Sequence, residues 1–519
     1  MSRRPPSLHL TVFLSSTLFI QVLSLVFSTP PQRLQGVARP APAEALEWKT
    51  MNTMDKAIDK AQVLSLIEER MPQIFDNLKE LVAFQSVHST PGLEEHNAGA
   101  AQWTIDTYRA AGISVEGIET TDGSTTIVGH REAAEGFPTV LLYSHFDVQP
   151  AGDAAEWTND PWTLTERDGR WYGRGAADCK GHVVMHVAVL EAMKQLQAEH
   201  PELGKLGIRV IVEGSEERGG YGLEDLLEAQ PELFEADLFM IADSGNDALG
   251  EPSICTALRG SAPVIVKLKT IAQPMHSGQY GGAAPDALVE LIKLLGTLHD
   301  DQGLVAVEGL TPTTRWQGVG PDEATFRDNA GVLEGVDVLG QDSGWAPNDL
   351  TVTNPSITIT GLDSLSVADS INSVPGYAGA VVSLRVPPGM DPKEAQDTLI
   401  AHLEKQKQEK NVNAQMEIER VSLAEAFSAD TSGPYLRGLT QALSDVYGKE
   451  TIEVGSGGSI PLTNKLLSQF PGAELALYGI EEPLCRIHSA DESVAPSEIR
   501  DIAAAELLFL ARVAASHQK

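Results

Sequence analysis

The sequence predicts an α/β protein in which a three-layer α/β/α domain with a mostly parallel sheet is interrupted by an inserted ferredoxin-like α+β domain. Three observations favour this fold. Helical and strand signals alternate from Val63 onward, which is typical of a parallel sheet covered by helices. After Gly260 the order becomes β-α-β-β-α-β, the pattern of a ferredoxin-like unit. The chain has 519 residues, which is too long for one compact core.

The first part of the chain supplies the alternating elements of the larger domain. The helices expected there cover residues 57–84, 97–111 and 182–196. The strands expected there cover residues 113–118, 125–129, 139–143, 208–213 and 238–243. Several of these strands are short apolar runs bounded by turn residues, as buried strands are.

The alternation of strands and helices is interrupted in the middle of the chain and resumes near its end. The expected strands of the insert cover residues 264–270, 356–361, 378–386 and 414–421, and its helices cover 285–298 and 391–408. An irregular acidic segment covers 300–350. The larger domain resumes with a helix at 434–447, a strand at 474–479 and a helix at 496–516. We therefore predict a segment of residues 1–53, a larger domain of residues 54–257 and 426–519, and an inserted domain of residues 258–425.

Charge and cysteine content exclude several classes of function. The formal net charge is −34 and the sequence pI is about 4.7. Nucleic acids and anionic membranes require a basic face, so neither is expected as a partner. The three cysteines, Cys179, Cys255 and Cys485, include no close pair. This spacing predicts neither a disulfide framework nor a cysteine-based zinc site.

The N-terminal residues allow two interpretations. Arg3 and Arg4 precede an apolar run at 10–27, the layout of a secretory signal or a membrane anchor, although no clear cleavage site follows. Alternatively, translation starts at Met51 or Met54, after a Pro/Ala-rich spacer. We favour this second, cytoplasmic interpretation. Export, or contact with a membrane through residues 3–27, is expected only if the N-terminal segment is retained.

Polar residues with metal-binding chemistry follow several of the expected strands. They are His145 and Asp147, Asp178 on a Gly-rich turn, Glu216 and Glu217, Asp243, and His488. Each has an ordinary structural alternative, such as a helix N-cap for the aspartate on the turn or a solvated acidic turn for the glutamate pair. Together, imidazole and carboxylate ligands without thiolates suit zinc, manganese or cobalt. The set is large enough for two metals, with one carboxylate left as a base.

The chain resembles the dinuclear metallopeptidase superfamily of aminoacylases, glutamate carboxypeptidases, succinyl-diaminopimelate desuccinylases and carnosinase-type dipeptidases. The resemblance extends from about residue 60 to the C-terminus. Six stretches carry it in order: 144–150, 173–181, 213–220, 276–282, 457–461 and 488–492. Three motifs are most similar to those of the carnosinase-like dipeptidase branch: Glu-Gly-x-Glu-Glu, His-Ser-Gly-x-x-Gly-Gly and Gly-Gly-Ser-Ile-Pro.

The resemblance implies a site with two divalent metal ions, for which zinc is favoured and manganese or cobalt are alternatives. Asp178 would bridge both ions. His145 and Asp243 would complete the coordination of one ion, and Glu217 and His488 that of the other.

The resemblance also assigns the proton transfers. Glu216 would be the general base and Asp147 would orient the first metal-binding histidine. The two cations would lower the pKa of a bridging water, and the resulting hydroxide would attack the amide carbonyl. The same glutamate would return the proton to the leaving amine.

The insert is implied to act as a lid and dimerisation domain. His276 would reach the active site of a partner subunit and stabilise the oxyanion, which implies a homodimer. Arg385 would bind the substrate carboxylate as a planar bidentate partner, and Asn372 would be a further polar contact from the lid. Gly458 and Ser459 lie in a Gly-rich loop that offers donors to the same carboxylate.

The implied activity is hydrolysis of the amide bond of dipeptides or short peptides with a free C-terminal carboxylate. One departure puts β-alanyl-histidine specificity in doubt: His402 is the only histidine between the middle of the insert and His488, and it is expected within a helix. Two alternatives stay open. The first is a deacylase or desuccinylase of N-acyl amino acids that uses the same site, and the second is a catalytically inactive peptide-binding homologue.

Overall fold

Within residues 58–517, the larger sheet contains nine strands. The computed structural model describes residues 58–517. The strand order is β1-β2-β6-β3-β7-β18-β8-β16, and β17 pairs with β8. These strands are β1 (Ser114–Glu119), β2 (Thr125–Arg131), β3 (Thr139–His145), β6 (Gly207–Glu213), β7 (Leu238–Ala242), β8 (Ser253–Leu258), β16 (Phe427–Ser428), β17 (Ile452–Ser456) and β18 (Glu474–Tyr478). The central pairings β6–β3, β3–β7 and β7–β18 are parallel.

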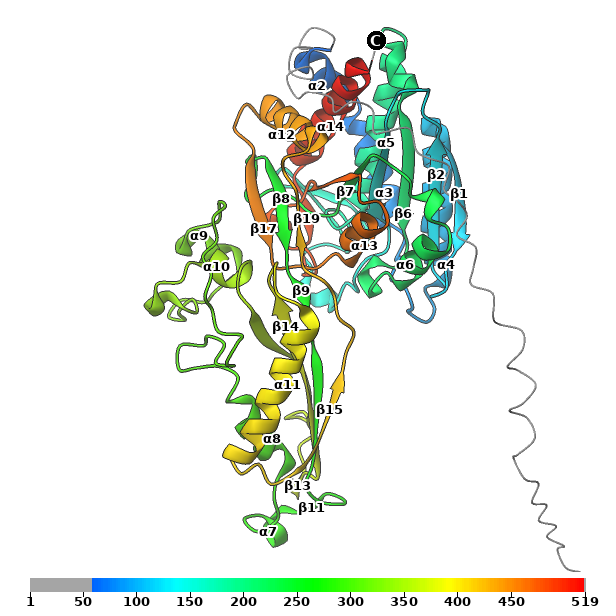
Figure 1. The fold of residues 1–519 in the computed structure, drawn as a ribbon. Helices are drawn as coiled ribbons and strands as arrows, with labels where there is room; N and C mark the ends of the chain where they lie inside the picture. Colours follow the sequence, from blue (N-terminus) through cyan, green and yellow to red (C-terminus); the bar gives the residue numbers. More distant parts are fainter. Residues whose placement is uncertain (1–57, 518–519) are drawn as a thin grey trace, which may run out of the picture. The chain divides into compact units, whose positions relative to one another are not determined.

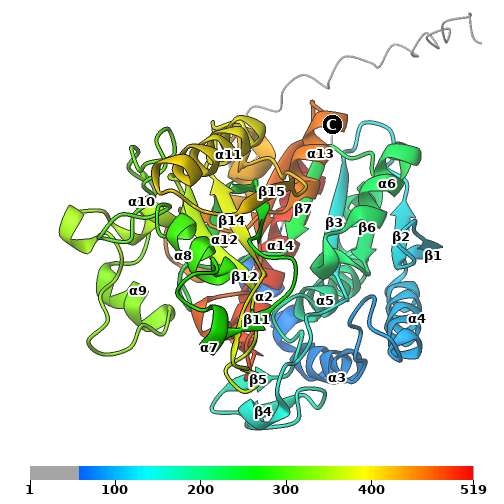
Figure 2. The same cartoon turned by 90° about the horizontal axis from the view of Figure 1, so that it is seen from below.

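Helices cover both faces of this sheet, as β3 illustrates. Val140 and Leu142 point into one apolar core, and Leu141 and Tyr143 point into another, because side chains alternate along a strand. The first core contains α2 (Lys60–Glu68), α3 (Met71–Val82), α4 (Glu94–Ala111), α5 (Lys180–Leu196), α12 (Pro434–Tyr447) and α14 (Pro496–Ser516). The second contains α6 (Tyr221–Ala229) and α13 (Pro461–Gln469). Figure 2 shows the strands between these helices, and the predicted three-layer α/β/α arrangement is confirmed.

A second, antiparallel sheet carries the insert. Its strand order is β12-β14-β10-β15, with β9 paired to β14. The elements are β9 (Gly260–Ser261), β10 (Val264–Lys269), α8 (Ala287–Leu295), β12 (Ser356–Asp363), β14 (Tyr377–Val386), α11 (Pro392–Glu409) and β15 (Gln415–Arg420). Apart from the two-residue β9, this is the β-α-β-β-α-β order that the sequence predicts. The two helices and the sheet enclose a core of their own (Figure 1).

Several shorter strands and helices lie in the connections between these main elements. They are the three-stranded sheet of β4 (Thr165–Arg167), β5 (Arg170–Tyr172) and β19 (Ser493–Val494), the pair β11 (Met275–His276) and β13 (Ser373–Val374), and the helices α7 (Ser277–Tyr280), α9 (Glu323–Asn329) and α10 (Pro347–Thr351). The chain leaves the larger sheet after β8 and rejoins it at β16. The exact domain boundaries stay predictions.

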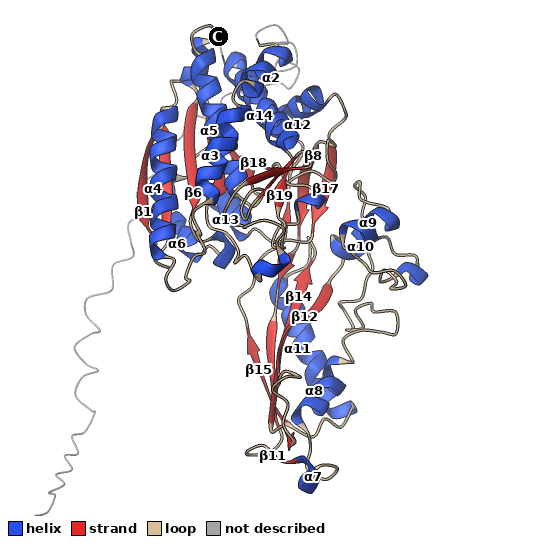
Figure 3. Ribbon diagram, turned by 180° about the vertical axis from the view of Figure 1, so that it is seen from behind, coloured by secondary structure: helices blue, strands red, loops and turns tan. Residues whose placement is uncertain are grey.

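One expected element is wrong. The single helix expected over residues 57–84 is two helices, α2 and α3 (Figure 3). The second begins at Met71, with Pro72 in its first turn. Proline lacks a backbone N–H and is tolerated only at the start of a helix, so the chain must break there.

The predictions for residues 1–53 lie outside the described residues. Among residues 58–517, no helix combines the length and the apolar character that a membrane crossing requires.

Candidate metal centre

The candidate ligands converge because three parallel strands end at one edge of the larger sheet. His145 is the last residue of β3, and Asp243 directly follows β7. Glu216 and Glu217 lie in the loop after β6. Ligand sites of open α/β sheets lie at such carboxyl ends. The strand order therefore brings together residues that are almost a hundred positions apart in the chain.

The imidazole of His145 is fully buried and its two nitrogens have different partners. Nδ1 lies 3.0 Å from the carbonyl oxygen of Asp147, to which it donates, and 3.4 Å from the carboxylate of the same residue. Nε2 lies 3.1 Å from Asp178 Oδ1 and 3.1 Å from Asp243 Oδ1. A hydrogen bond from Nδ1 leaves the lone pair on Nε2, the arrangement of a metal-binding histidine.

The two carboxylate oxygens of Asp178 face two different histidines. Oδ1 faces His145, and Oδ2 lies 2.9 Å from His488 Nε2. The same His488 nitrogen is 3.2 Å from Glu217 Oε2. One carboxylate therefore joins two groups of donor atoms, which is the geometry expected of a bridging ligand.

The loop that carries the two glutamates is held from one side by Asp147 and Gln149. The carboxylate of Asp147 accepts hydrogen bonds from the backbone N–H groups of Glu216 and Glu217, both at 3.1 Å. Gln149 Nε2 donates to Glu217 Oε2 at 2.9 Å. Asp147 thus positions the glutamate loop in addition to contacting His145. Sequence reasoning did not single out Gln149.

Asp122 holds the same loop from its other side and was also missed. It lies in the turn between β1 and β2 and accepts hydrogen bonds from the Ser215 hydroxyl at 2.8 Å and from Gly222 N–H at 3.1 Å. The Ser124 hydroxyl adds a bond to that of Ser215 at 3.1 Å. No motif marks Asp122, because its contacts are to residues about a hundred positions away.

Glu492 fixes the Gly-rich turn that carries Asp178. Its buried carboxylate pairs with Arg174 Nη1 at 2.7 Å and accepts from the backbone N–H groups of Gly175 at 3.0 Å and of Ala177 and Asp178 at 3.1 Å. The motif at 488–492 contains this glutamate, but the sequence alone gave it no role.

The electrostatics of the cluster indicate missing positive charge. Burial, followed by the charge of Asp243, raises the pKa of Glu216 well above its usual value. Burial and the charge of Asp178 do the same to the pKa of Glu481, which sequence reasoning also missed. Hydrogen bonds to Asp178 and Glu217 raise the pKa of His488 to about 10. Buried carboxylates gathered in this way need a shared proton or a compensating cation, and a divalent metal would supply the cation.

The donor atoms fit metal ions. Within residues 58–517, three groups of residues offer donor atoms that lie within 4.8 Å of one another in each group: Asp178 with Glu217 and His488, Asp178 with Asp243 and Glu481, and His145 with Cys179 and Asp243. Imidazole nitrogens and carboxylate oxygens suit divalent zinc, manganese or cobalt. The sequence indicated no thiolate ligand. The Cys179 thiol lies near this set but donates to the carbonyl oxygen of Ala242 at 3.2 Å.

Two of the predicted substrate contacts lie next to each other. Arg385 on β14 donates from Nη1 to the Ser459 hydroxyl at 2.9 Å, and this hydroxyl donates to the Arg259 carbonyl oxygen. Gly458 lies one residue away and its N–H donates to Ser456 Oγ at 3.2 Å. The pair joins the insert to the loop after β17.

The remaining two predicted residues, His276 and Asn372, lie elsewhere. Both are exposed on adjoining segments of the insert, where His276 pairs with Ser373 between β11 and β13. The Asn372 carbonyl oxygen accepts from Ser277 N–H at 3.0 Å. Among residues 58–517, no hydrogen bond or ion pair joins the side chain of His276 or Asn372 to the metal cluster.

A three-layer α/β/α fold with imidazoles and carboxylates gathered at the carboxyl ends of its parallel strands is typical of a metal-dependent hydrolase. The chain belongs to the family described as peptidase family M20/M25/M40, which residues 141–512 match. The protein is therefore an enzyme of the metallopeptidase class, and its donor groups support the use of a divalent metal.

Individual relatives agree with this assignment. The chain is 44% identical to the cysteinylglycine-S-conjugate dipeptidase of Corynebacterium striatum over 84% of its length and 95% of the relative. Two solved structures share the fold. Human carnosine dipeptidase 1 has a TM-score of 0.76 at 24% identity, and the dipeptidase Dug1p of Saccharomyces cerevisiae has a TM-score of 0.77 at 20% identity. Each alignment covers 88% of this chain and 99% of the solved one.

Proposed function

We propose that this chain is a dinuclear metallodipeptidase that hydrolyses the amide bond of dipeptides with a free C-terminal carboxylate. The observation that carries the proposal is the placement of Asp178 between His145 and His488, with Glu216 beside them. The similarity to a dipeptidase over nearly the whole of both chains supports the same reaction.

The relative's name suggests the substrate class. Its substrates are S-conjugates of cysteinylglycine, and we propose that this chain accepts cysteinylglycine dipeptides that carry a substituent on sulfur. Arg385 and Ser459 would bind the carboxylate of the C-terminal residue, because a guanidinium and a hydroxyl are suited to that group. Asn372 and the backbone of Gly458 would provide further polar contacts.

Two divalent cations, with zinc favoured over manganese or cobalt, would be held by the clustered residues. His145 and Asp243 would hold one, Glu217 and His488 the other, and Asp178 would contact both. When bound, the cations acidify the attacking water and polarise the scissile carbonyl.

Glu216 is the residue we propose as the general base. Its Oε2 lies 4.0 Å from His145 Nε2, and its side chain remains 24% exposed, so it borders the cluster without being enclosed by it. Burial and the charge of Asp243 raise the pKa of Glu216, which strengthens this carboxylate as a proton acceptor. It would take a proton from the attacking water and deliver it to the nitrogen of the departing amino acid. Asp147 keeps it in place through the backbone.

We propose a homodimer in which His276 serves the partner's site. β12 is the edge strand of the insert's sheet, and apolar side chains near it are exposed. These are Leu362 (53%), Leu365 (57%), Val367 (94%) and Ile371 (66%). An exposed strand edge beside exposed apolar residues is the kind of surface that pairs with a second chain.

Mixing two inactive variants tests this arrangement. His276→Ala and Glu216→Gln would each be inactive alone, but a heterodimer would contain one complete site. Co-refolded mixtures should then recover about a quarter of wild-type activity. Recovery that stays at the level of the separate variants would rule out a contribution from the partner.

A substrate panel tests the reaction itself. Turnover is measured with cysteinylglycine, its S-alkyl and S-benzyl derivatives, β-alanyl-histidine, and N-acetyl and N-succinyl amino acids, in the presence of zinc, manganese or cobalt. The proposal expects dipeptides to be cleaved fastest. Preferential cleavage of N-acyl amino acids would establish the deacylase alternative instead, and binding of dipeptides without turnover would establish an inactive homologue.

A further inference from the structure

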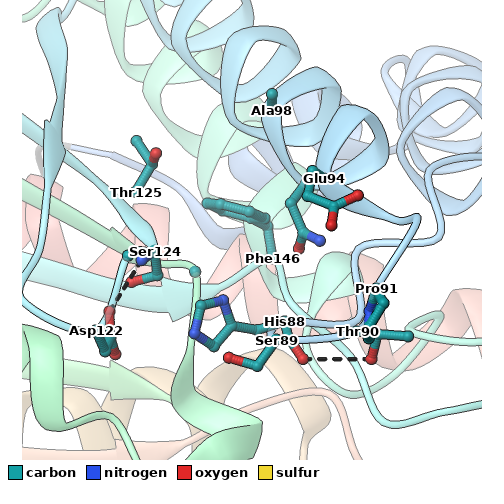
Figure 4. Close-up of a pocket in the computed structure, with 13 residues that line it drawn as sticks. His88, Ser89, Thr90, Pro91, Glu94, Ala98, Asp122, Ser124, Thr125 and Phe146 are labelled. Carbon is teal, nitrogen blue, oxygen red and sulfur yellow. Dashed lines mark hydrogen bonds between the residues drawn. The ribbon is translucent and has the colours of Figure 1, made fainter. Parts of the chain in front are cut away.

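A cavity of about 480 Å³ lies beside the candidate metal centre, and its lining residues are different from the proposed metal ligands. Figure 4 shows it between the first turn of α4, the turn that joins β1 to β2, and the ring of Phe146. Phe146 stands between His145 and Asp147, and the cavity also touches Gly214 in the loop after β6. The other lining residues used below are His88, Pro91, Glu94, Asn97, Asp122 and Thr125.

The imidazole of His88 has no partner in the described part of the chain. The residue is only 8% exposed, and its ring lies in the cavity (Figure 4). Within residues 58–517, its ring makes no hydrogen bond or ion pair. The ring nitrogens are not among the enclosed polar atoms of the described residues, so they open onto the cavity, where solvent or a ligand can bond them. A ligand in the cavity would provide the missing hydrogen bond.

Two other lining residues carry a polar atom with no partner among the described residues. Asn97 donates from Nδ2 to the carbonyl oxygens of Val87 at 3.2 Å and Leu93 at 2.9 Å, which fixes its amide and leaves the buried Oδ1 without a donor. The Thr125 hydroxyl makes no hydrogen bond within the described residues. Asn97 Oδ1 is enclosed, whereas the ring nitrogens of His88 and the hydroxyl of the half-buried Thr125 open onto the cavity and can accept a hydrogen bond.

The charge of the lining excludes anions. Backbone N–H groups of Glu94 itself and of Gly92 lower the pKa of Glu94. Burial opposes ionisation of Asp122, but hydrogen bonds from Ser124 N–H and neighbouring hydroxyls lower its pKa overall. Both carboxylates are ionised at neutral pH, and no lysine or arginine among residues 58–517 lines the cavity. A bare metal ion is also disfavoured, since no metal-binding set within residues 58–517 includes a lining residue.

We propose that this cavity is a binding site for a small aliphatic ammonium compound without an anionic group. Its N–H groups would donate to a ring nitrogen of His88 and to the hydroxyl oxygen of Thr125. The carboxylates of Glu94 and Asp122 would balance its charge. Its methylene groups would lie against Phe146 and Pro91.

Calorimetric titration of the metal-loaded full-length enzyme tests the proposal with three four-carbon probes of different charge. Putrescine carries two ammonium groups, 1,4-butanediol is neutral, and succinate is anionic. Saturable binding of putrescine is expected, with weaker binding of the diol and none of succinate. Equal binding of succinate, or no saturable binding of putrescine, would overturn the proposal.

Variants locate the binding. His88→Phe keeps the ring but removes its nitrogens, and Thr125→Val is isosteric. Either change is expected to weaken putrescine binding by about tenfold or more, since a hydrogen bond to a charged group is lost. His130→Phe, an exposed histidine on β2, is the matched control and should bind as wild type does. Unchanged binding to both cavity variants would mean that putrescine binds elsewhere, for example at the metals, and would refute the assignment.

Discussion

The metal cluster and the exposed end of the insert differ in how they are built. His145 and Asp178 are buried, and their positions are fixed by hydrogen bonds from the same chain. His276 and Asn372 are exposed and have no such contacts to the cluster. The comparison teaches that one chain brings the candidate metal-binding groups together by itself, whereas under the proposed function the residues at this end of the insert would act on a substrate only across a dimer.

The largest effect is expected from Glu216→Gln, which tests the role of the cluster in proton transfer. The amide cannot accept a proton, so kcat should fall by about 10²–10⁴-fold. Metal content, measured by elemental analysis, should remain that of the wild type because Glu216 is not a proposed ligand. Retention of full turnover would show that the base is another group.

Glu492→Gln tests whether the cluster depends on its supporting turn. The change leaves the buried guanidinium of Arg174 without its ionic partner, so stability should fall by about 3–5 kcal/mol. The measurement is urea denaturation of the metal-loaded protein. Lys393→Ala, which breaks an exposed pair on α11, is the control and should leave the transition in place. A Glu492 variant as stable as this control would contradict the supporting role.

His276→Ala tests the exposed end of the insert. Loss of an oxyanion donor should lower kcat by about 10²–10³-fold. Metal content and melting temperature should not change, because the side chain is exposed and does not contact the cluster. If the variant instead lost metal, His276 would belong to the cluster of its own chain and the contrast between the two regions would fail.

Asp122→Asn tests the second support of the glutamate loop. Weaker acceptance from Ser215 and Gly222 should allow the loop to shift, lowering kcat by about 10-fold with a smaller change in KM. Asp122→Glu keeps the charge but moves it, so it should be impaired as well. Metal content separates this positioning role from a ligand role. Activity equal to wild type in both variants would remove Asp122 from the account.

A pH dependence of stability is expected from His182, which lies next to the turn that carries Asp178. Burial lowers the pKa of His182 from 6.5 to about 3, so the folded protein keeps this ring neutral while the unfolded chain binds a proton. Stability should therefore be lost as the pH falls from 6.5 towards 3, by about 1.4 kcal/mol per pH unit from this residue. His182→Gln should show a shallower decline between pH 6.5 and 5 in urea denaturation. If the stability of the variant and that of the wild type fell equally with pH, His182 would not be the source of the pH dependence.

The elements that the sequence predicted well are those with strong local patterns. The apolar run that ends at His145 is a central parallel strand, and the order of the insert's elements matches the expectation. The strand-end residues converge because parallel strands share one carboxyl edge. The break between α2 and α3 could have been inferred from Pro72, whose effect on a helix is local.

Other features could not be predicted because they depend on contacts between distant segments. Asp122 is an ordinary turn residue until β2 pairs with β6 and brings it beside Ser215. Glu481 approaches Asp178 only because β18 lies next to β7. The unpartnered ring of His88 likewise becomes apparent only once its surroundings are folded.

The central claim is that one chain holds a pair of divalent cations between His145 and His488, joined by Asp178. Anomalous diffraction from crystals of the active, metal-loaded enzyme tests it most directly. The account predicts two peaks per chain, one within reach of His145 and Asp243 and one within reach of Glu217 and His488, with Asp178 touching both. A single peak in a fully active enzyme, or peaks away from these residues, would contradict it.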